Sequence, residues 1–241
     1  MEKLLYPLWK AEELAADAFR DALLAWSKQQ LAQASLSGLR LAVADSGVAP
    51  AAGRRLSSGA PLPDGLLSLW LPDPGTRAPL EASLADRVAR FECYRVREVE
   101  PLVNRRAGAD GRVPGMCQVA LLYRPARLRE EEWLSRWQGS HTPIAIDTQA
   151  TFGYRQNLVV QALAGSAAPP DAVVEENFPP GAMTSEYAFY GVEAGDEASL
   201  ARRRDELMAS CARFIDFDRI DVVPMTEYLL QAPPEGLAGG G

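Results

Sequence analysis

Three short stretches of this sequence occur twice, in the same order and at nearly the same spacing. Residues 38–43 align with residues 153–158, the pentapeptide EASLA at 81–85 recurs at 197–201, and LLY at 4–6 recurs at 121–123. The three offsets are 115, 116 and 117 residues, and such agreement is typical of a duplicated unit. The repeat therefore predicts two halves, 1–103 and 116–241, joined by a polar, glycine-rich linker at 104–115.

Hydrophobic periodicity and turn residues divide each half in the same way. In the first half we expect a strand at 3–9, a helix at 14–33, strands at 39–44 and 66–71, a helix at 79–88 and a strand at 91–103, with a loop at 47–61. In the second half we expect a strand at 117–123, a helix at 130–138, strands at 154–163 and 172–176, a helix at 196–215 and a strand at 221–230. This order, taken twice, is that of the split βαβ or ferredoxin-like unit.

A unit of this kind covers one face of its sheet with helices and leaves the other face bare and apolar. A second copy is the natural cover, and two such sheets packed face to face can curl into a barrel. The fold class is therefore predicted as α+β, with two tandem ferredoxin-like repeats packed as an intramolecular α+β barrel. The alternative is two independent domains on a linker. Because the duplication covers the bare faces internally, we expect a viable monomer, and any homodimer to form through other surfaces.

Charge and motif content exclude several functions. The formal net charge is −7, and no basic stretch is present, so nucleic acid is not an expected partner. The sequence contains no run of 18 apolar residues, so we expect no membrane span. Its three cysteines are scattered, which favours the reducing cytoplasm. No nucleotide-binding, zinc-protease or nucleophile-elbow motif appears, and one histidine cannot form a multi-histidine metal site. We therefore expect no cofactor and no metal.

The single histidine, His141, is the first candidate for chemistry. Trp133, Trp137 and His141 are spaced four residues apart and so share one helical face, which Pro143 is expected to end or kink. The helix C-terminus favours a charged imidazole and the tryptophans disfavour it, so the direction of the pKa shift stays open. An imidazole here can act as a general acid or base. The alternative is a structural helix cap.

Further candidates follow His141 along the chain. Asp147 is close enough to orient the imidazole, although a solvated loop acid is the alternative. Tyr154 lies on a predicted strand with Asn157 on the opposite face, and either side chain can bind substrate oxygens or simply pack. Glu175 interrupts an apolar strand, which indicates either a catalytic acid or solvation at a sheet edge.

Several of these residues form a recognisable series. Residues 131–137 (EEWLSRW), 141–145 (HTPIA) and 154–157 (YRQN) resemble the signature of the EthD-domain family, in which a helix ending W…H-x-P-L precedes a strand Y-x-x-N. Residues 171–175 (DAVVE) resemble the family's D-G-V-x-E strand, and residues 64–70 (DGLLSLW) resemble it in the first half. The resemblance is good across about 117–230 and degenerate across 3–103.

The resemblance implies a dimeric α+β barrel that acts on a small, often hydrophobic, oxygenated molecule without a cofactor. Related proteins include monooxygenases, cyclases, dehydratases, decarboxylases and lactone isomerases. The family's pocket histidine corresponds to His141, and the absence of a second histidine excludes a two-histidine mechanism. We expect an acid–base enzyme with Trp133 and Trp137 as pocket walls and Tyr154, Glu175, Asp147 and Asn157 as polar groups of the site. The alternative is a non-catalytic binding or accessory protein.

Overall fold

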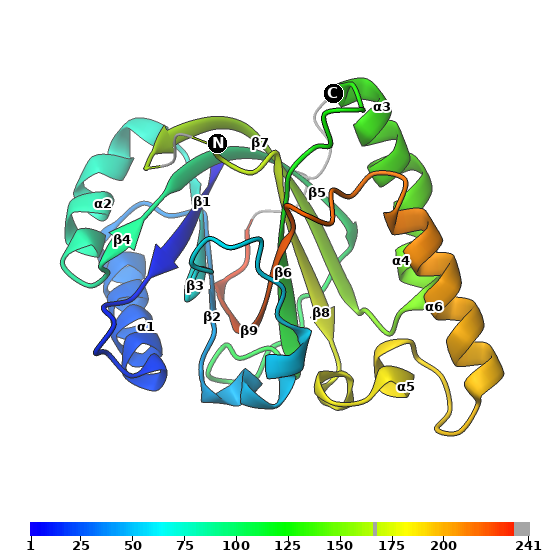
Figure 1. Ribbon diagram of the computed structural model, residues 1–241. Coiled ribbons are helices and arrows are strands. Elements are labelled where there is room, and N and C mark those ends of the chain that lie inside the picture. The colour runs from blue at the N-terminus through cyan, green and yellow to red at the C-terminus, as the bar shows by residue number, and fades with distance from the viewer. Residues whose placement is uncertain (166–167, 234–241) are drawn as a thin grey trace.

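In the part of the chain that the structure describes, nine strands form one sheet that closes on itself. The computed structural model describes residues 1–165 and 168–233. The strands follow the order β3-β2-β9-β6-β8-β7-β5-β1-β4, and an additional pairing between β1 and β3 closes the ring. Helices α1 and α2 lie on one side of this barrel, and helices α3, α4 and α6 lie on the other (Figure 1). The predicted α+β barrel is therefore confirmed.

The elements of the first half are β1 (Glu2–Trp9), α1 (Ala16–Gln33), β2 (Gly38–Val43), the 3₁₀ segment η1 (Ser46–Arg54), β3 (Gly65–Leu71), the short 3₁₀ turn η2 (Pro74–Thr76), α2 (Arg77–Ala85), β4 (Arg90–Phe91) and β5 (Cys93–Leu102). Those of the second half are β6 (Met116–Leu122), α3 (Glu130–Leu134), the π-helical segment η3 (Ser135–His141), α4 (Thr142–Thr148), β7 (Gly153–Ala164), β8 (Ala172–Phe178), the 3₁₀ segment η4 (Pro180–Met183), α5 (Glu186–Phe189), α6 (Glu197–Cys211) and β9 (Asp221–Gln231).

The same strand order occurs in each half. The first half runs β2-β3-β1-β5 and the second runs β7-β8-β6-β9. The halves meet at two antiparallel seams, β2 with β9 and β5 with β7. Covering both sheet faces explains why β3, with the sequence GLLSLWL, is buried at every position. A common origin of the halves by duplication stays a prediction.

Three apolar clusters stabilise this arrangement. One lies beneath α1 and α2 and includes Phe19 and Trp26; another lies beneath α3, α4 and α6 and includes Trp133 and Phe214. The third fills part of the barrel interior. Alternation along each strand sends one set of side chains to the helices and the next to the interior. Each strand therefore separates two environments.

Three sequence expectations need correction. The loop expected at 47–61 contains η1, and the strand expected at 91–103 is divided into β4 and β5 at Glu92. The helix expected at 130–138 continues through η3 and α4 to Thr148. Among residues 1–165 and 168–233, no helix has both the length and the apolar character that crossing a bilayer requires.

Candidate functional site

A π-helical segment positions the aromatic face and the histidine. At the end of η3 the backbone N–H of Thr142 donates to the carbonyl of Trp137, five residues earlier. The wider turn joins directly to α4, whose first turn contains Pro143, a position where a missing N–H costs little. Pro143 therefore does not end the helix, and His141 lies within it rather than at its C-terminus. Such π segments are frequent at functional sites.

His141 is buried and neutral at pH 7. Its side chain is 6% exposed, its ring lies 4.7 Å from that of Phe214, and its Nδ1 lies 3.0 Å from Oγ of Ser210 on α6. Burial lowers the pKa of His141 to about 4. The apolar surroundings thus outweigh any helix-dipole effect. Nε2 has no protein partner among the described residues, which leaves it available to a ligand.

Tyr154 and Glu176 lie beside each other on the sheet below His141. They are directly paired residues of β7 and β8, so their side chains project from the same face. Glu176 is 9% exposed and, among the described residues, makes no hydrogen bond or ion pair, and burial raises its pKa to about 7. Tyr154 accepts a hydrogen bond from Nε1 of Trp137 at 3.3 Å, and burial and Glu176 raise its pKa.

These groups open into one cavity between the sheet and the second-half helices. The cavity has a volume of about 210 Å³, and His141, Tyr154, Glu176, Trp137 and Cys211 contribute to its wall. The rest of the wall is mostly aliphatic and aromatic, with two glutamines. We call this space the inner cavity. It combines a neutral imidazole and a carboxyl group that is half ionised near pH 7, which is the pairing that acid–base chemistry requires.

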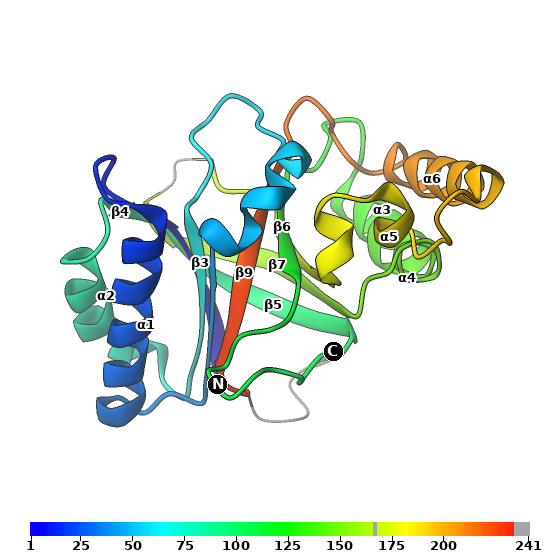
Figure 2. The ribbon, with the colours of Figure 1, turned by 90° about the horizontal axis from the view of Figure 1, so that it is seen from below.

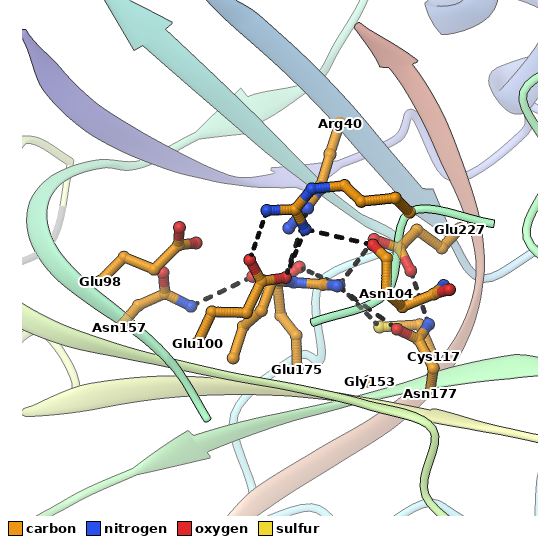
Figure 3. Close-up of polar contacts among 12 residues, drawn as sticks. Arg40, Glu98, Glu100, Asn104, Cys117, Gly153, Asn157, Glu175, Asn177 and Glu227 are labelled. Atoms are coloured by element: carbon orange, nitrogen blue, oxygen red, sulfur yellow. Dashed lines mark hydrogen bonds and ion pairs between the residues drawn. The ribbon is translucent and has the colours of Figure 1, made fainter. Parts of the chain in front are cut away.

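Glu175 and Asn157 lie on the opposite face, inside the barrel (Figure 3). Nζ of Lys3 lies 2.7 Å from Oδ1 of Asn157 and 3.4 Å from Glu175, and Arg155 contacts Glu175 at 3.1 Å. Burial alone would raise the pKa of Glu175, but Arg155 and Lys3 outweigh it and hold the pKa well below its usual range. Glu175 is therefore a permanent anion in an ion-pair network, unsuited to proton exchange.

The repeat reappears in this interior network. Arg40 and Arg155 occupy matching positions of the two aligned segments, and both are almost fully buried. Arg40 pairs with Glu100 at 3.4 Å (Figure 3). Arg155 pairs with Glu227 at 2.6 Å. Each half thus contributes one arginine and its acidic partners. Lys3 of the first half also contacts Glu175 and Asn157 of the second, so the network links the two halves inside the barrel.

The structure thus brings together only some of the predicted site residues. His141, Trp137 and Tyr154 line the inner cavity, whereas Glu175 and Asn157 do not. Trp133 packs behind Trp137 with ring centroids 5.1 Å apart and donates to the carbonyl of Phe214, so it supports the wall without forming it. Asp147 is exposed, and Ser210 takes the role of orienting the imidazole.

Sequence reasoning missed Glu176 and Ser210. Two adjacent glutamates end the predicted strand at 172–176, and only one can share a face with Tyr154. The register between β7 and β8 decides which, and no single strand contains that information. Across residues 1–165 and 168–233, no group of three or more His, Cys, Asp or Glu side chains is arranged to hold a metal ion.

The fold and the cavity define an α+β barrel with a titratable pocket beneath one helix layer. A solved structure described as an anthrone oxidase-like protein is similar over 93% of this chain and 90% of that one, with a TM-score of 0.50 and 7% identity. A structure described as a putative chlorite dismutase has a TM-score of 0.44 and 12% identity over 96% of each chain. No protein-family model and no curated protein matches the sequence, so the EthD resemblance stays a prediction.

The two buried groups should give opposite pH dependences of stability. The unfolded chain binds a proton on His141 below about 6.5 while the folded chain does so only near 4, so this group makes the fold more stable as pH rises between them. Folded Glu176 keeps its proton up to about 7 whereas the unfolded chain loses it near 4.5, so this group makes the fold less stable as pH rises. In wild type the two effects oppose each other.

As pH rises from 4.5 to 7, we expect the unfolding free energy of Glu176→Gln to increase relative to that of wild type. As pH rises from 4 to 6.5, we expect that of His141→Gln to decrease relative to wild type. Each slope should approach 1.4 kcal/mol per pH unit at most, roughly the cost of one titrating group. Urea unfolding at several pH values measures this. Asp147→Asn, at an exposed carboxylate, is the matched control and should show no such slope. Parallel curves for all variants would contradict the assignment.

Proposed function

We propose that this protein is an EthD-like, cofactor-independent acid–base enzyme that acts on a small hydrophobic carbonyl or phenolic compound. One observation carries the proposal: His141 and Glu176, whose pKa values burial shifts in opposite directions, both face one mainly apolar cavity. The α+β barrel fold shared with the oxidase-like structure is compatible with it. The residues expected to perform the chemistry are His141, Glu176 and Tyr154.

The geometry favours proton abstraction next to a carbonyl. Ionised Glu176 takes the proton from carbon, and the electron pair moves onto the carbonyl oxygen to give an enolate. In its Nε2–H tautomer the neutral His141 donates a hydrogen bond to that oxygen, and its Nδ1 accepts one from the hydroxyl of Ser210, 3.0 Å away. Glu176 then returns its proton to the same or a neighbouring atom. Tyr154, held by Trp137, positions the ring of the substrate.

The cavity limits the size of the substrate. An apolar cavity of about 150 Å³ accommodates benzene, so the 210 Å³ space suits one ring or a compact fused pair. Isomerisation, dehydration and cyclisation can begin with an enolate or phenolate of this kind, and decarboxylation next to a carbonyl produces one when the bond to CO₂ breaks. An oxidoreductase reaction of an activated phenolate with oxygen uses the same first step.

The test follows the proton itself. With 1-tetralone in D₂O, we expect the protein to accelerate exchange of the protons next to the carbonyl, observed by proton NMR. His141→Ala should slow the exchange about a hundredfold or more, since it removes the hydrogen bond to the developing oxyanion, and should leave the melting temperature within a few degrees. Ser210→Ala removes only the hydrogen bond that orients the imidazole ring, so its exchange rate should lie between those of wild type and His141→Ala. Exchange no faster than in buffer would contradict the proposal.

A second candidate is a non-catalytic protein that binds or sequesters such a compound. The mainly apolar wall of the inner cavity favours it. Binding of 1-tetralone without exchange, measured by titration calorimetry alongside the NMR assay, distinguishes this candidate from the enzyme.

A further inference from the structure

A second cavity adjoins the inner one on the side of the first half. It has a volume of about 550 Å³, is more open, and its wall includes Arg54, Thr184 and Glu186. Leu56, Gln118 and Val222 line both cavities, so the two spaces meet at these three residues. We call this second space the outer cavity. The half-exposed side chain of Leu56 lies at the junction.

The junction residue comes from the half that lacks the histidine. Leu56 follows η1, and its backbone pairs with that of Val222 on β9 through N–H···O distances of 3.1 and 2.9 Å. The N–H of Ser58 donates to Oδ1 of Asp221 at 2.7 Å. Figure 2 shows η1 beside α5 at the end of the barrel. These hydrogen bonds hold the segment against the second half, so the position of Leu56 in the cavity wall is fixed by its backbone.

Arg54 fixes the other side of this contact. Its Nε donates to the carbonyl of Ala182 at 2.6 Å, and its guanidinium lies 4.3 Å above the ring of Phe189, which lines the inner cavity. The same group pairs with Glu186 at 3.1 Å. Because this pair cancels its own charge, the outer cavity offers hydrogen-bonding groups without net charge. A neutral polar group is favoured there over a carboxylate or an ammonium.

We propose that the outer cavity is a second subsite, and that the substrate is an elongated molecule. Its ring lies in the inner cavity, and an uncharged polar tail passes Leu56 and lies beside Thr184 and Gln118. Leu56, supplied by the first half, thus determines which tail is admitted. The inference rests on the proposed function only for the nature of the ring, since the tail subsite is defined by the two adjoining cavities.

The test compares a short and a long phenol by titration calorimetry on the whole protein. The probes are 4-ethylphenol, which fits the inner cavity, and 4-(4-hydroxybutyl)phenol, whose tail reaches the junction. Because Leu56 lines both cavities, the readout is the difference between the probes: Leu56→Trp should weaken the long phenol about tenfold more than the short one by displacing its tail. The matched control is Val103→Trp, at an exposed apolar residue that lines neither cavity, and it should change neither affinity.

A third probe tests the charge of the tail. The carboxylate 4-(4-hydroxyphenyl)butanoate should bind wild type more weakly than the hydroxybutyl compound. Equal losses for both phenols in Leu56→Trp, unchanged affinities, or no binding of either phenol to wild type would overturn the proposal. Length discrimination without exchange of 1-tetralone protons would refute the acid–base function and leave the subsite standing. Exchange without length discrimination would refute the subsite alone.

Discussion

We expect Glu176→Gln to lose proton exchange on 1-tetralone by about a hundredfold or more while the protein becomes more stable at pH 8. The amide has the shape of the carboxyl group but cannot take a proton from carbon. It also removes a buried charge whose pKa is raised to about 7, so the fold no longer bears the cost of ionising that group. Exchange rates by NMR and unfolding free energies by urea titration, on the same samples, measure both effects.

The pH profile of wild type gives an independent check of this assignment. Exchange should rise with pH and level off above about 7, where Glu176 is ionised. Full activity in Glu176→Gln, or a profile without that rise, would exclude Glu176 as the base.

The neighbouring substitution Glu175→Gln should have the opposite signature. Glu175 is 2% exposed and contacts Arg155 and Lys3 inside the barrel, so its loss removes one of two acidic partners from each cation and leaves Glu227 to Arg155 and Glu98 to Lys3. We expect a loss of about 1–3 kcal/mol of unfolding free energy, the range for losing a buried hydrogen bond to a charged group. Below the new melting temperature, the exchange rate should stay close to that of wild type, because the inner cavity is on the other face of the strand.

Asp147→Asn serves as the control for Glu175→Gln, since this exposed acid should change stability by less than about 0.5 kcal/mol. A loss of activity in Glu175→Gln at full stability would move the site into the barrel interior. Comparing Glu175→Gln with Glu176→Gln therefore tests which face of β8 contributes to the site.

Most of the fold could be predicted from the sequence because the repeat requires the same order of elements in both halves. Aligning 38–43 with 153–158 was sufficient to match β2 with β7, and the apolar runs placed the other long strands within a few residues of their observed bounds. The helix was cut short at Pro143 because proline usually ends a helix, and the π-helical turn before it is set by tertiary packing. That the chain closes into a barrel followed from the two bare sheet faces.

The site was less accessible to prediction because it depends on pairings between distant strands. The spacing of Trp137 and His141 within one helix was sufficient to place both on the cavity wall. The choice between Glu175 and Glu176 depends on the register of β8 against β7, and a shift of one residue exchanges the two faces. Ser210 and Leu56 come from elements far away in sequence, so no local pattern connects either of them with His141.

The two seams, β2 with β9 and β5 with β7, have a consequence for how copies of this chain recognise each other. Each half meets the other through strand edges, and the only covalent connection between them is the stretch at 104–115. Two molecules that exchanged their second halves would restore every hydrogen bond of both seams, so the bonds themselves do not select the closed monomer. The balance between the closed monomer and the exchanged dimer therefore depends on the effective concentration at which the connection holds the two halves near each other. In this architecture, the connection at 104–115, which contributes no residue to the wall of the inner cavity, determines whether that cavity is built from one chain or from two.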